Sequence, residues 1–270
     1  MTLLDLAARA RAADGVSPFN EATQMALRDG AATRLTRYDE VVAAVAVGDA
    51  PVEIVVEPRY RRQGRGRALV DQLLRDGESR FWAHGDLPGA RALADAVGAT
   101  PERTLLVLST SGTPAEAAGV GALPGVTVRG FRDEDADAVV AVNGRAFAHH
   151  PEQGAMDRAD FDRRRAEPWY DPAGLLVAER DGRLIGFHWT KVEDGRGEVY
   201  VVGVDPSAAG HGLGTALTAA GLRHLGDRGV DGIDLYVEGD NAAALAVYRR
   251  LGFRESARDV LYAVAGASAH

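Results

Sequence analysis

The sequence predicts an α/β (α+β) protein with two tandem domains, each a mixed, mostly antiparallel β-sheet flanked by helices. A strand that ends in an acidic residue and proline, followed by a Gly-x-Gly turn, occurs at 56–66 and again 148 residues later at 204–214. Gly85-Asp86 and Gly239-Asp240 are a second repeated pair, 154 residues apart. Residues 110–125 are small and rich in Gly and Pro, as in a linker. We therefore expect domains at 1–112 and 126–270, with a linker at 113–125.

The composition excludes several classes of function. The 270 residues are 46% hydrophobic and 26% charged, as in soluble globular proteins, and the net charge of −8 argues against nucleic acid as a main partner. Because there is no cysteine, disulfides and thiolate metal sites are excluded, and the seven histidines show no metal-ligand spacing. No basic, apolar leader and no run of membrane-spanning length is present. We expect a cytoplasmic, monomeric protein with no metal and no membrane partner.

The first half begins with strand-like residues at 34–38 and 40–45, and 51–56 forms the next strand. After the first glycine turn, 81–83 is a short strand, 88–97 a helix and 103–108 a closing strand. Arginines crowd the glycine turn, at Arg61, Arg62, Arg65 and Arg67. They either complement the phosphates of a ligand or form a solvated basic face, and the sequence leaves both interpretations open.

In the second half, 126–129 opens the sheet and 133–147 is a helix with an acidic first turn. Residues 149–169 are charged and irregular, and strands at 175–179 and 184–189 flank the turn Asp181-Gly182. A strand at 198–204, the glycine turn with its helix, and a strand at 232–237 follow. Asn241 caps a helix that reaches Arg250, Gly252 ends it, and 253–264 is the last strand.

The stretch from Glu198 to Leu217 is the centre of the candidate site. Asp205-Pro206 breaks a valine-rich strand, and three glycines then precede a helix. Free N–H groups at such a turn, beside the positive end of a helix dipole, bind phosphate. A P-loop would need a lysine after the glycines, and a Rossmann turn needs G-x-G-x-x-G in a βαβ unit, so neither fits. A tight turn without a ligand stays open as an alternative.

The turn resembles the acyl-CoA pyrophosphate loop of the GNAT acetyltransferases, [QR]-x-x-G-x-[GA] after a strand that ends in a V-D-P-like break. Gly212-Leu213-Gly214 is the G-x-G, and Ala209 stands where that family usually has Gln or Arg. The resemblance implies acetyl-CoA as acetyl donor.

Acyl transfer from such a thioester to an amine needs a base to keep the amine neutral. Glu198, Tyr200 and Val202 alternate along a strand, so we expect them on one face and Glu198 along the groove of the thioester. Glu198 is therefore the predicted general base. A solvated carboxylate at the start of a strand is the alternative interpretation.

The reaction also needs a hydrogen-bond donor to the carbonyl and an acid for the leaving thiolate. Gly203 within a valine-rich strand suggests a bulge, which would leave the N–H of Val204 as the donor. Tyr248 lies two helical turns after Asn241, and a phenol of pKa about 10 suits a thiolate leaving group. Tyr248 is the predicted general acid, with a half-buried core tyrosine as the alternative.

The first half lacks both catalytic groups. Ala50 stands 148 residues before Glu198, and Ala94 stands 154 residues before Tyr248. We expect this half to bind acyl-CoA at most, or only to support the second half.

Four strings extend the resemblance: H-P-E-Q-G at 150–154, G-F-H-W-T-K-V at 186–192, G-E-V-Y-V-V-G-V-D-P at 197–206 and L-Y-V-E-G-D-N at 235–241. They are similar to the mycothiol synthases (mycothiol acetyltransferases), a family of tandem GNAT enzymes, over nearly the whole chain and most clearly in the second half. The resemblance implies transfer of acetyl from acetyl-CoA to the cysteinyl amine of desacetylmycothiol (Cys-GlcN-Ins), giving mycothiol and CoA.

The same likeness implies the binding residues. Acetyl-CoA would be bound by Val202, Gly203, Val204, Ala209, Gly210, His211, Gly212, Leu213, Gly214, Thr215, Asn241, Ala242, Ala243, Ala244, Leu245 and Ala246, and a second acetyl-CoA by Ile54, Val55, Val56, Arg62, Gln63, Gly64, Arg65, Gly66 and Arg67. The acceptor would contact Glu21, Glu152, Lys191, Glu198 and Tyr236.

Two other functions stay open. A GNAT enzyme could act on another amine, such as an aminoglycoside or a protein N-terminus. A non-catalytic acyl-CoA-binding or sensing protein is the alternative from another class, and the pair Glu198 and Tyr248 argues against it.

Overall fold

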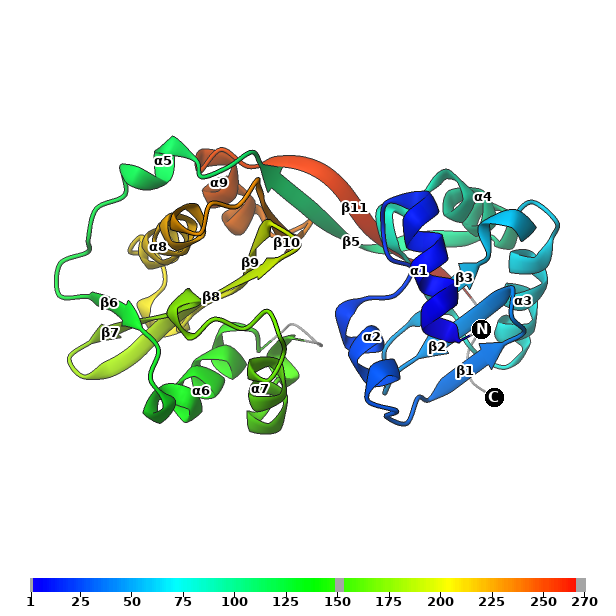
Figure 1. The fold of residues 1–270 in the computed structure, drawn as a ribbon, viewed down its shortest axis with the longest axis horizontal. Helices are drawn as coiled ribbons and strands as arrows, with labels where there is room; N and C mark the ends of the chain where they lie inside the picture. Colours follow the sequence, from blue (N-terminus) through cyan, green and yellow to red (C-terminus); the bar gives the residue numbers. More distant parts are fainter. Residues whose placement is uncertain (1, 149–152, 266–270) are drawn as a thin grey trace. The chain divides into compact units, whose positions relative to one another are not determined.

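The structure, a computed structural model, describes residues 2–148 and 153–265 (Figure 1). Its contacts divide the chain into two compact units. Unit 1 comprises Met1–Leu106, Glu238–Asp240 and Ala257–His270, and unit 2 comprises Val107–Val237 and Asn241–Ser256. Residues 257–265 therefore belong to the unit that the first half builds. The sequence modules expected at 1–112 and 126–270 stay a prediction.

Unit 1 has helices on both faces of a mixed sheet. Its elements are α1 (Leu3–Asp14), α2 (Glu21–Arg28), β1 (Leu35–Tyr38), β2 (Val42–Ala46), β3 (Val52–Val56), η1 (Pro58–Tyr60), α3 (Arg65–Arg75), β4 (Arg80–Ala83), η2 (His84–Asp86) and α4 (Pro88–Val97), with parts of β5 (Ala99–Thr110) and β11 (Arg254–Val264). The strand order is β1-β2-β3-β4-β11-β5, and the β3–β4 pair is parallel whereas β1–β2, β2–β3 and β4–β11 are antiparallel.

The two faces of this sheet follow from the alternation of side chains along β2. Ala43 and Val45 pack with Leu6 of α1, whereas Val42 and Ala44 pack with helix α3. The helices α1 and α2 were not among the expected elements. A capping box starts α1, since Thr2 and Asp5 bond each other's backbone N–H groups.

Unit 2 repeats this plan and is where most candidate residues lie. Its elements are α5 (Ala115–Ala118), β6 (Thr127–Gly130), η3 (Asp133–Asp135), α6 (Ala136–Ala146), η4 (Gln153–Ala155), α7 (Arg158–Arg165), η5 (Pro172–Gly174), β7 (Leu175–Arg180), β8 (Arg183–Glu193), β9 (Arg196–Val204), η6 (Pro206–Ala208), α8 (Leu213–Asp227), β10 (Ile233–Glu238) and α9 (Ala242–Arg250). The strand order is β11-β5-β10-β9-β8-β7-β6, antiparallel from β6 to β9 and parallel at β9–β10. The predicted mixed, mostly antiparallel α/β architecture is confirmed.

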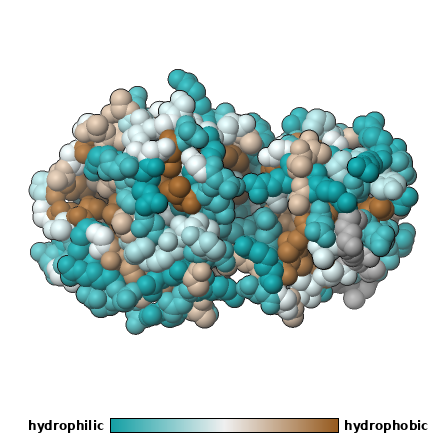
Figure 2. Space-filling model, viewed as in Figure 1, coloured by the Kyte–Doolittle hydropathy of each residue, from teal (hydrophilic) through white to brown (hydrophobic). Residues whose placement is uncertain are grey.

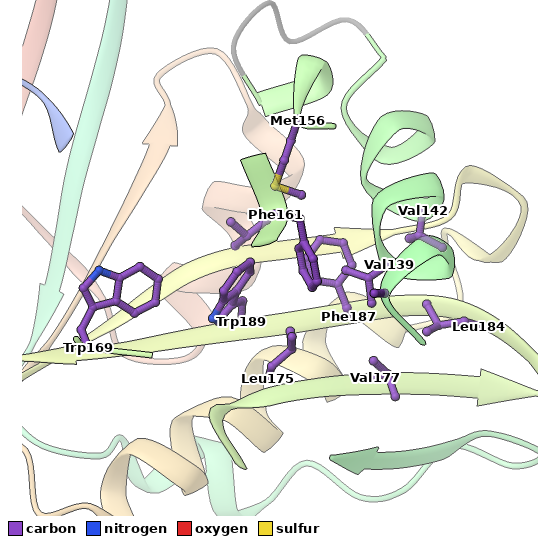
Figure 3. Packing of buried hydrophobic residues seen from close by; sticks show 12 residues of the cluster. Val139, Val142, Met156, Phe161, Trp169, Leu175, Val177, Leu184, Phe187 and Trp189 are labelled. Carbon is purple, nitrogen blue, oxygen red and sulfur yellow. The ribbon is translucent and has the colours of Figure 1, made fainter. Parts of the chain in front are cut away.

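Helices cover both faces of the unit 2 sheet, with α6 and α7 on one side and α8 on the other (Figure 1). On the α6 side, Phe187 and Trp189 of β8 are fully buried with Phe161 of α7, whose ring meets that of Trp189 edge-on at 5.1 Å (Figure 3). On the other side, His188 bonds the carbonyl of Leu217 in α8. The stretch 149–169, expected to be irregular, thus contains the helix α7, which Asp157 caps.

The internal repeat is visible in the backbone. The short helices η1 and η6 begin at Pro58 and Pro206, and the following long helices have Gly64 and Gly212 as N-caps, with φ of 78° and 80°. This left-handed conformation favours glycine, which explains its presence at both positions. The tandem duplication predicted from the sequence is therefore confirmed.

The surface is largely polar, and hydrophobic residues gather only in small separate patches on the face shown in Figure 2. Among the described residues, no helix combines the length and the apolar character that a membrane span requires. In the same part of the chain, no three His, Asp or Glu side chains are grouped as metal ligands would be.

Candidate active site

The strands β9 and β10 separate after a short parallel ladder. The ladder joins Gly197 to Val199 with Ile233 to Leu235, whereas β9 continues to Val204 and β10 to Glu238. Beyond Val199, the edge of β9 that faces β10 is therefore no longer paired with β10 in the ladder. Such a divergence between two parallel strands can accept an extended, amide-containing ligand by strand-like hydrogen bonds.

The N–H group of Val204 is directed into this divergence. The adjacent N–H of Asp205 donates to the carbonyl of Ile185 on β8, at 2.9 Å. Because successive N–H groups of a strand point to opposite sides, that of Val204 points toward β10. This is the direction that a donor to a thioester carbonyl would need.

The predicted bulge at Gly203 is wrong. Gly203 lies in register with Phe187, and the ladder between β8 and β9 is instead interrupted at Tyr200, because Trp189 faces Val201 and Thr190 faces Val199. A side chain at Gly203 would place its Cβ 2.4 Å from the Phe187 ring. Glycine is therefore explained by the close approach of an aromatic ring.

The bulge at Tyr200 also corrects the predicted face of β9. Two consecutive residues at a bulge face the same side, so Tyr200 and Val201 both pack in the core that α6 and α7 cover. Val202 instead packs on the α8 side. The expectation that Val202 shares a face with Glu198 and Tyr200 is wrong for this reason.

Glu198, the predicted base, is half-buried in β9 and lies directly opposite Lys191 of β8. The ammonium group of Lys191 is 3.2 Å from the carboxylate of Glu193. It also lies 5.1 Å from the centre of the Trp169 ring and 5.9 Å from that of Tyr200. Two aromatic faces and a carboxylate thus hold a cation beside the predicted base.

Trp169 was missed in the sequence. It lies in the charged stretch between α7 and η5, where no hydrophobic period indicated a structural or functional role. Its ring is 4.8 Å from that of Tyr200, and it is nearly buried. The only available signal was an isolated Trp-Tyr pair after a proline.

The glycine loop ends in a helix N-terminus, as predicted. Gly210 and Gly212 both have positive φ, and α8 begins at Leu213. The first N–H that bonds within this helix is that of Ala216, to the carbonyl of Gly212. The N–H groups before Ala216, in the first turn of this 15-residue helix, are therefore available to bind an anion at its positive end.

Tyr248, the predicted acid, lies in α9, which follows β10. Its ring is half-buried and meets the ring of Phe253 edge-on at 6.0 Å. Burial raises the pKa of Tyr248 to about 12, because the charged phenolate is poorly solvated there. The group therefore stays protonated at neutral pH, as a general acid must.

The other predicted contacts are placed as follows. Asn241 caps α9 by accepting the N–H of Ala244 at 3.0 Å, which puts residues 242–246 in the first turns of that helix. Tyr236 of β10 is 50% exposed. In unit 1, Glu21 is the first residue of α2. Glu152 lies outside the described residues.

In the first glycine loop, residues 54–56 form the end of β3 and residues 62–67 lead into α3. Arg62 has φ of 61°, the conformation that Gly210 has at the matching position. Two of the four arginines are engaged within the unit, since Arg61 pairs with Asp14 and Arg67 with Asp71. Arg65 lies over the ring of Tyr60.

Comparison with known proteins identifies the family. Residues 145–253 match the Acetyltransferase (GNAT) family. Mycothiol acetyltransferase of Clavibacter michiganensis subsp. michiganensis is 53% identical over 275 residues, which cover 96% of this chain and 90% of that protein. Mycothiol acetyltransferase of Thermomonospora curvata is 50% identical, with 96% and 92% covered. The chain belongs to the mycothiol acetyltransferase family.

The fold of this mycothiol acetyltransferase family member is also that of solved tandem proteins. A tandem GNAT protein from the clavulanic acid biosynthesis pathway matches with a TM-score of 0.69 at 22% identity, covering 99% of this chain and 94% of that one. A GCN5-related N-acetyltransferase from Sphaerobacter thermophilus matches with a TM-score of 0.66 at 23% identity, covering 96% and 90%.

Membership in the mycothiol acetyltransferase family makes the chain an acyltransferase, as the sequence predicted. The GNAT match at 145–253 contains β8, β9, α8, β10 and α9, which are the elements of the candidate site. The first copy of the repeat lies before these residues.

Proposed function

We propose that the protein transfers the acetyl group of acetyl-CoA to the cysteinyl amine of desacetylmycothiol, giving mycothiol and CoA. The observation that carries the proposal is the divergence of β9 and β10 directly before a helix N-terminus. A pantetheine chain fits beside β9, and its pyrophosphate fits the first turn of α8. The names of relatives at 50% identity or more support the acceptor.

In the proposed reaction, Glu198 takes a proton from the cysteinyl ammonium, directly or through a water, and the neutral amine attacks the thioester carbonyl. The N–H of Val204 stabilises the oxyanion that forms. The tetrahedral intermediate then loses the second proton of its nitrogen to water, the carbon–sulfur bond breaks, and the hydroxyl of Tyr248 donates its proton to the leaving thiolate. Products are the amide and CoA, with Glu198 and Tyr248 exchanging protons with solvent before the next turnover.

The acceptor is a polar pseudodisaccharide that carries an amine and several hydroxyls. We assign its contacts to Glu152, Lys191 and Tyr236 in the second half of the chain and to Glu21 in the first. The ring faces of Trp169 and Tyr200 support this role, because they restrict the ammonium of Lys191 to one region. We further propose that the first glycine loop binds acetyl-CoA without reaction, and that the reaction is cytoplasmic, where acetyl-CoA is available.

The test is release of CoA thiol by the purified full-length chain with acetyl-CoA and desacetylmycothiol, set against a panel of other amines. Preference for desacetylmycothiol over an aminoglycoside and over peptide N-termini is expected. Equal or faster release with another amine would replace the proposed acceptor. Binding of CoA without release by any amine would indicate a sensor instead.

A further inference from the structure

Asp205 is a buried carboxylate at the junction between β9 and the glycine loop. Its side chain is only 3% exposed. One carboxylate oxygen accepts the backbone N–H of Ser207 at 3.0 Å and the hydroxyl of Ser207 at 2.7 Å. Its own N–H donates to Ile185 of β8. Asp205 thus connects the end of the sheet to the start of the loop.

Arg145 binds the other oxygen of this carboxylate. It reaches from the last turn of α6, and its Nε and Nη2 atoms both lie 2.8 Å from Oδ2 of Asp205. Arg183 is a second, more distant cation at 3.6 Å. Hydrogen bonds from Ser207, followed by those from Arg145, lower the pKa of Asp205 to about 2. The carboxylate is therefore charged throughout the pH range in which the protein would work.

The first copy of the repeat has a comparable ion pair, in which the arginine approaches the carboxylate without hydrogen-bond geometry. Glu57, 148 residues before Asp205, is 7% exposed at its side chain, and Nε of Arg9 in α1 lies 2.9 Å from its carboxylate. The proposed base and acid, in contrast, have alanines at their matching positions. The ion pair is therefore found with the glycine loop in both copies, whereas the catalytic groups are found in one.

The glycine loop needs such an attachment. Gly210 and Gly212 allow the backbone many conformations, so the position of the first turn of α8 depends on where the loop is held. Backbone N–H groups bind an anion well only when they converge on it at hydrogen-bond distance. An ion pair at the start of the loop holds the loop in this geometry before the ligand arrives. Little conformational entropy of the loop is then lost on binding.

We propose that Asp205 and Arg145 are positioning residues for the binding of acyl-CoA: together they hold the glycine loop so that the first turn of α8 faces the pyrophosphate. The inference rests on the proposed function, in which this loop binds acetyl-CoA. It assigns a role in donor binding to two side chains that need not touch the donor.

The test measures the dissociation constant for CoA by calorimetry with the full-length chain. Asp205→Asn removes the charge and keeps the shape, and Arg145→Met removes the partner, which is 45% exposed. Asp135→Asn is the matched control in the same unit. Asp135 is also nearly buried, with a side chain 10% exposed and 2.7 Å from Arg129, but it lies directly before the helix α6 and far from the glycine loop in sequence.

Both Asp205→Asn and Arg145→Met should raise the dissociation constant for CoA about tenfold, whereas Asp135→Asn should leave it within about twofold. Urea unfolding of each variant shows whether the losses of stability are comparable. If Asp205→Asn does not fold, the dissociation constant of Arg145→Met for CoA decides between the expected result and its opposite.

Unchanged affinity in the folded variants would overturn the inference, and so would an equal loss in Asp135→Asn, which would indicate general loosening. Failure of the wild-type protein to bind CoA is a different result. It would contradict the proposed function itself, in which the glycine loop binds acetyl-CoA.

Discussion

Lys191 and Glu198 lie directly opposite each other on the antiparallel strands β8 and β9. Side chains at such positions have Cβ atoms about 5 Å apart and interact across the strands. The proposed base is therefore next to a cation that two aromatic rings and Glu193 hold in place.

Glu198→Gln should lower kcat at least about tenfold, because the amide keeps the shape of the side chain but cannot accept the amine proton. The dissociation constant for CoA should stay unchanged, since the loop is intact. Steady-state kinetics with desacetylmycothiol and calorimetry with CoA measure the two effects. Glu179→Gln is the control, a strand carboxylate in β7 that pairs with Arg129. Wild-type turnover in Glu198→Gln would contradict the assignment of the base.

Tyr248→Phe should also lower kcat about tenfold or more, because the thiolate would leave without a proton donor. Since the pKa of Tyr248 is about 12, its ionisation should not limit activity on the alkaline side up to pH 10. The edge-on contact with Phe253 survives in the variant, so its melting temperature should stay close to that of the wild type. Full activity in this variant would contradict Tyr248 as the acid, whereas an alkaline limb below pH 10 that the substitution abolishes would keep the role and contradict the raised pKa.

The repeated elements of the fold could be predicted because local rules determine them. The backbone preferences of a few residues determine where a strand ends at an acidic residue and proline, where a glycine turn forms and where a helix is capped. Gly212 accordingly precedes α8 in the glycine turn, and Asn241 caps α9. The bulge at Tyr200 could not be predicted, since it depends on how Trp189 and Val201 align across two strands. The role of Gly203 depends likewise on a ring from the neighbouring strand. The position of Trp169 beside Lys191 needs the tertiary fold.

Gly203→Ala should destabilise the protein by about 1 to 3 kcal/mol, because the new methyl group must displace the ring of Phe187, which is fully buried. Urea unfolding measures the loss. Phe187→Leu alone should also destabilise, by removal of packed atoms. The double variant should lose less than the sum of the single losses, because the smaller side chain gives the methyl group room. Strict additivity would show that the two positions do not interact.

His188 should make the protein sensitive to acid. Burial lowers its pKa to about 4, an effect that the hydrogen bond to the carbonyl of Leu217 only partly offsets. In the unfolded chain the pKa is about 6.5, so between pH 6.5 and 4 the unfolded state binds a proton that the folded state does not. The free energy of unfolding should therefore fall as the pH drops through this window, by up to about 3 kcal/mol from this group.

The measurement is urea unfolding of the wild type and His188→Asn at several pH values. The asparagine amide can still donate to Leu217 but does not titrate. The difference in unfolding free energy between the two proteins should be largest above pH 6.5 and should shrink toward pH 4. A difference that is constant over this range would show that His188 does not carry the acid sensitivity.

His84 in unit 1 should show the opposite dependence. Burial by itself would lower its pKa, but hydrogen bonds to Asp259 at 2.9 Å and to Glu53 at 2.6 Å outweigh that effect and raise the pKa to about 10. Because the folded pKa lies above the unfolded value of about 6.5, the stabilisation is fully present below pH 6.5 and is lost as the pH rises through 10.

Removing the imidazolium leaves two buried carboxylates without their shared cation, so His84→Gln should destabilise strongly at pH 6. The difference from the wild type should shrink between pH 6.5 and 10, the reverse of the trend for His188, and urea unfolding across that range measures it. A difference that grows toward pH 10 would mean that His84 is neutral in the folded protein and would contradict its raised pKa.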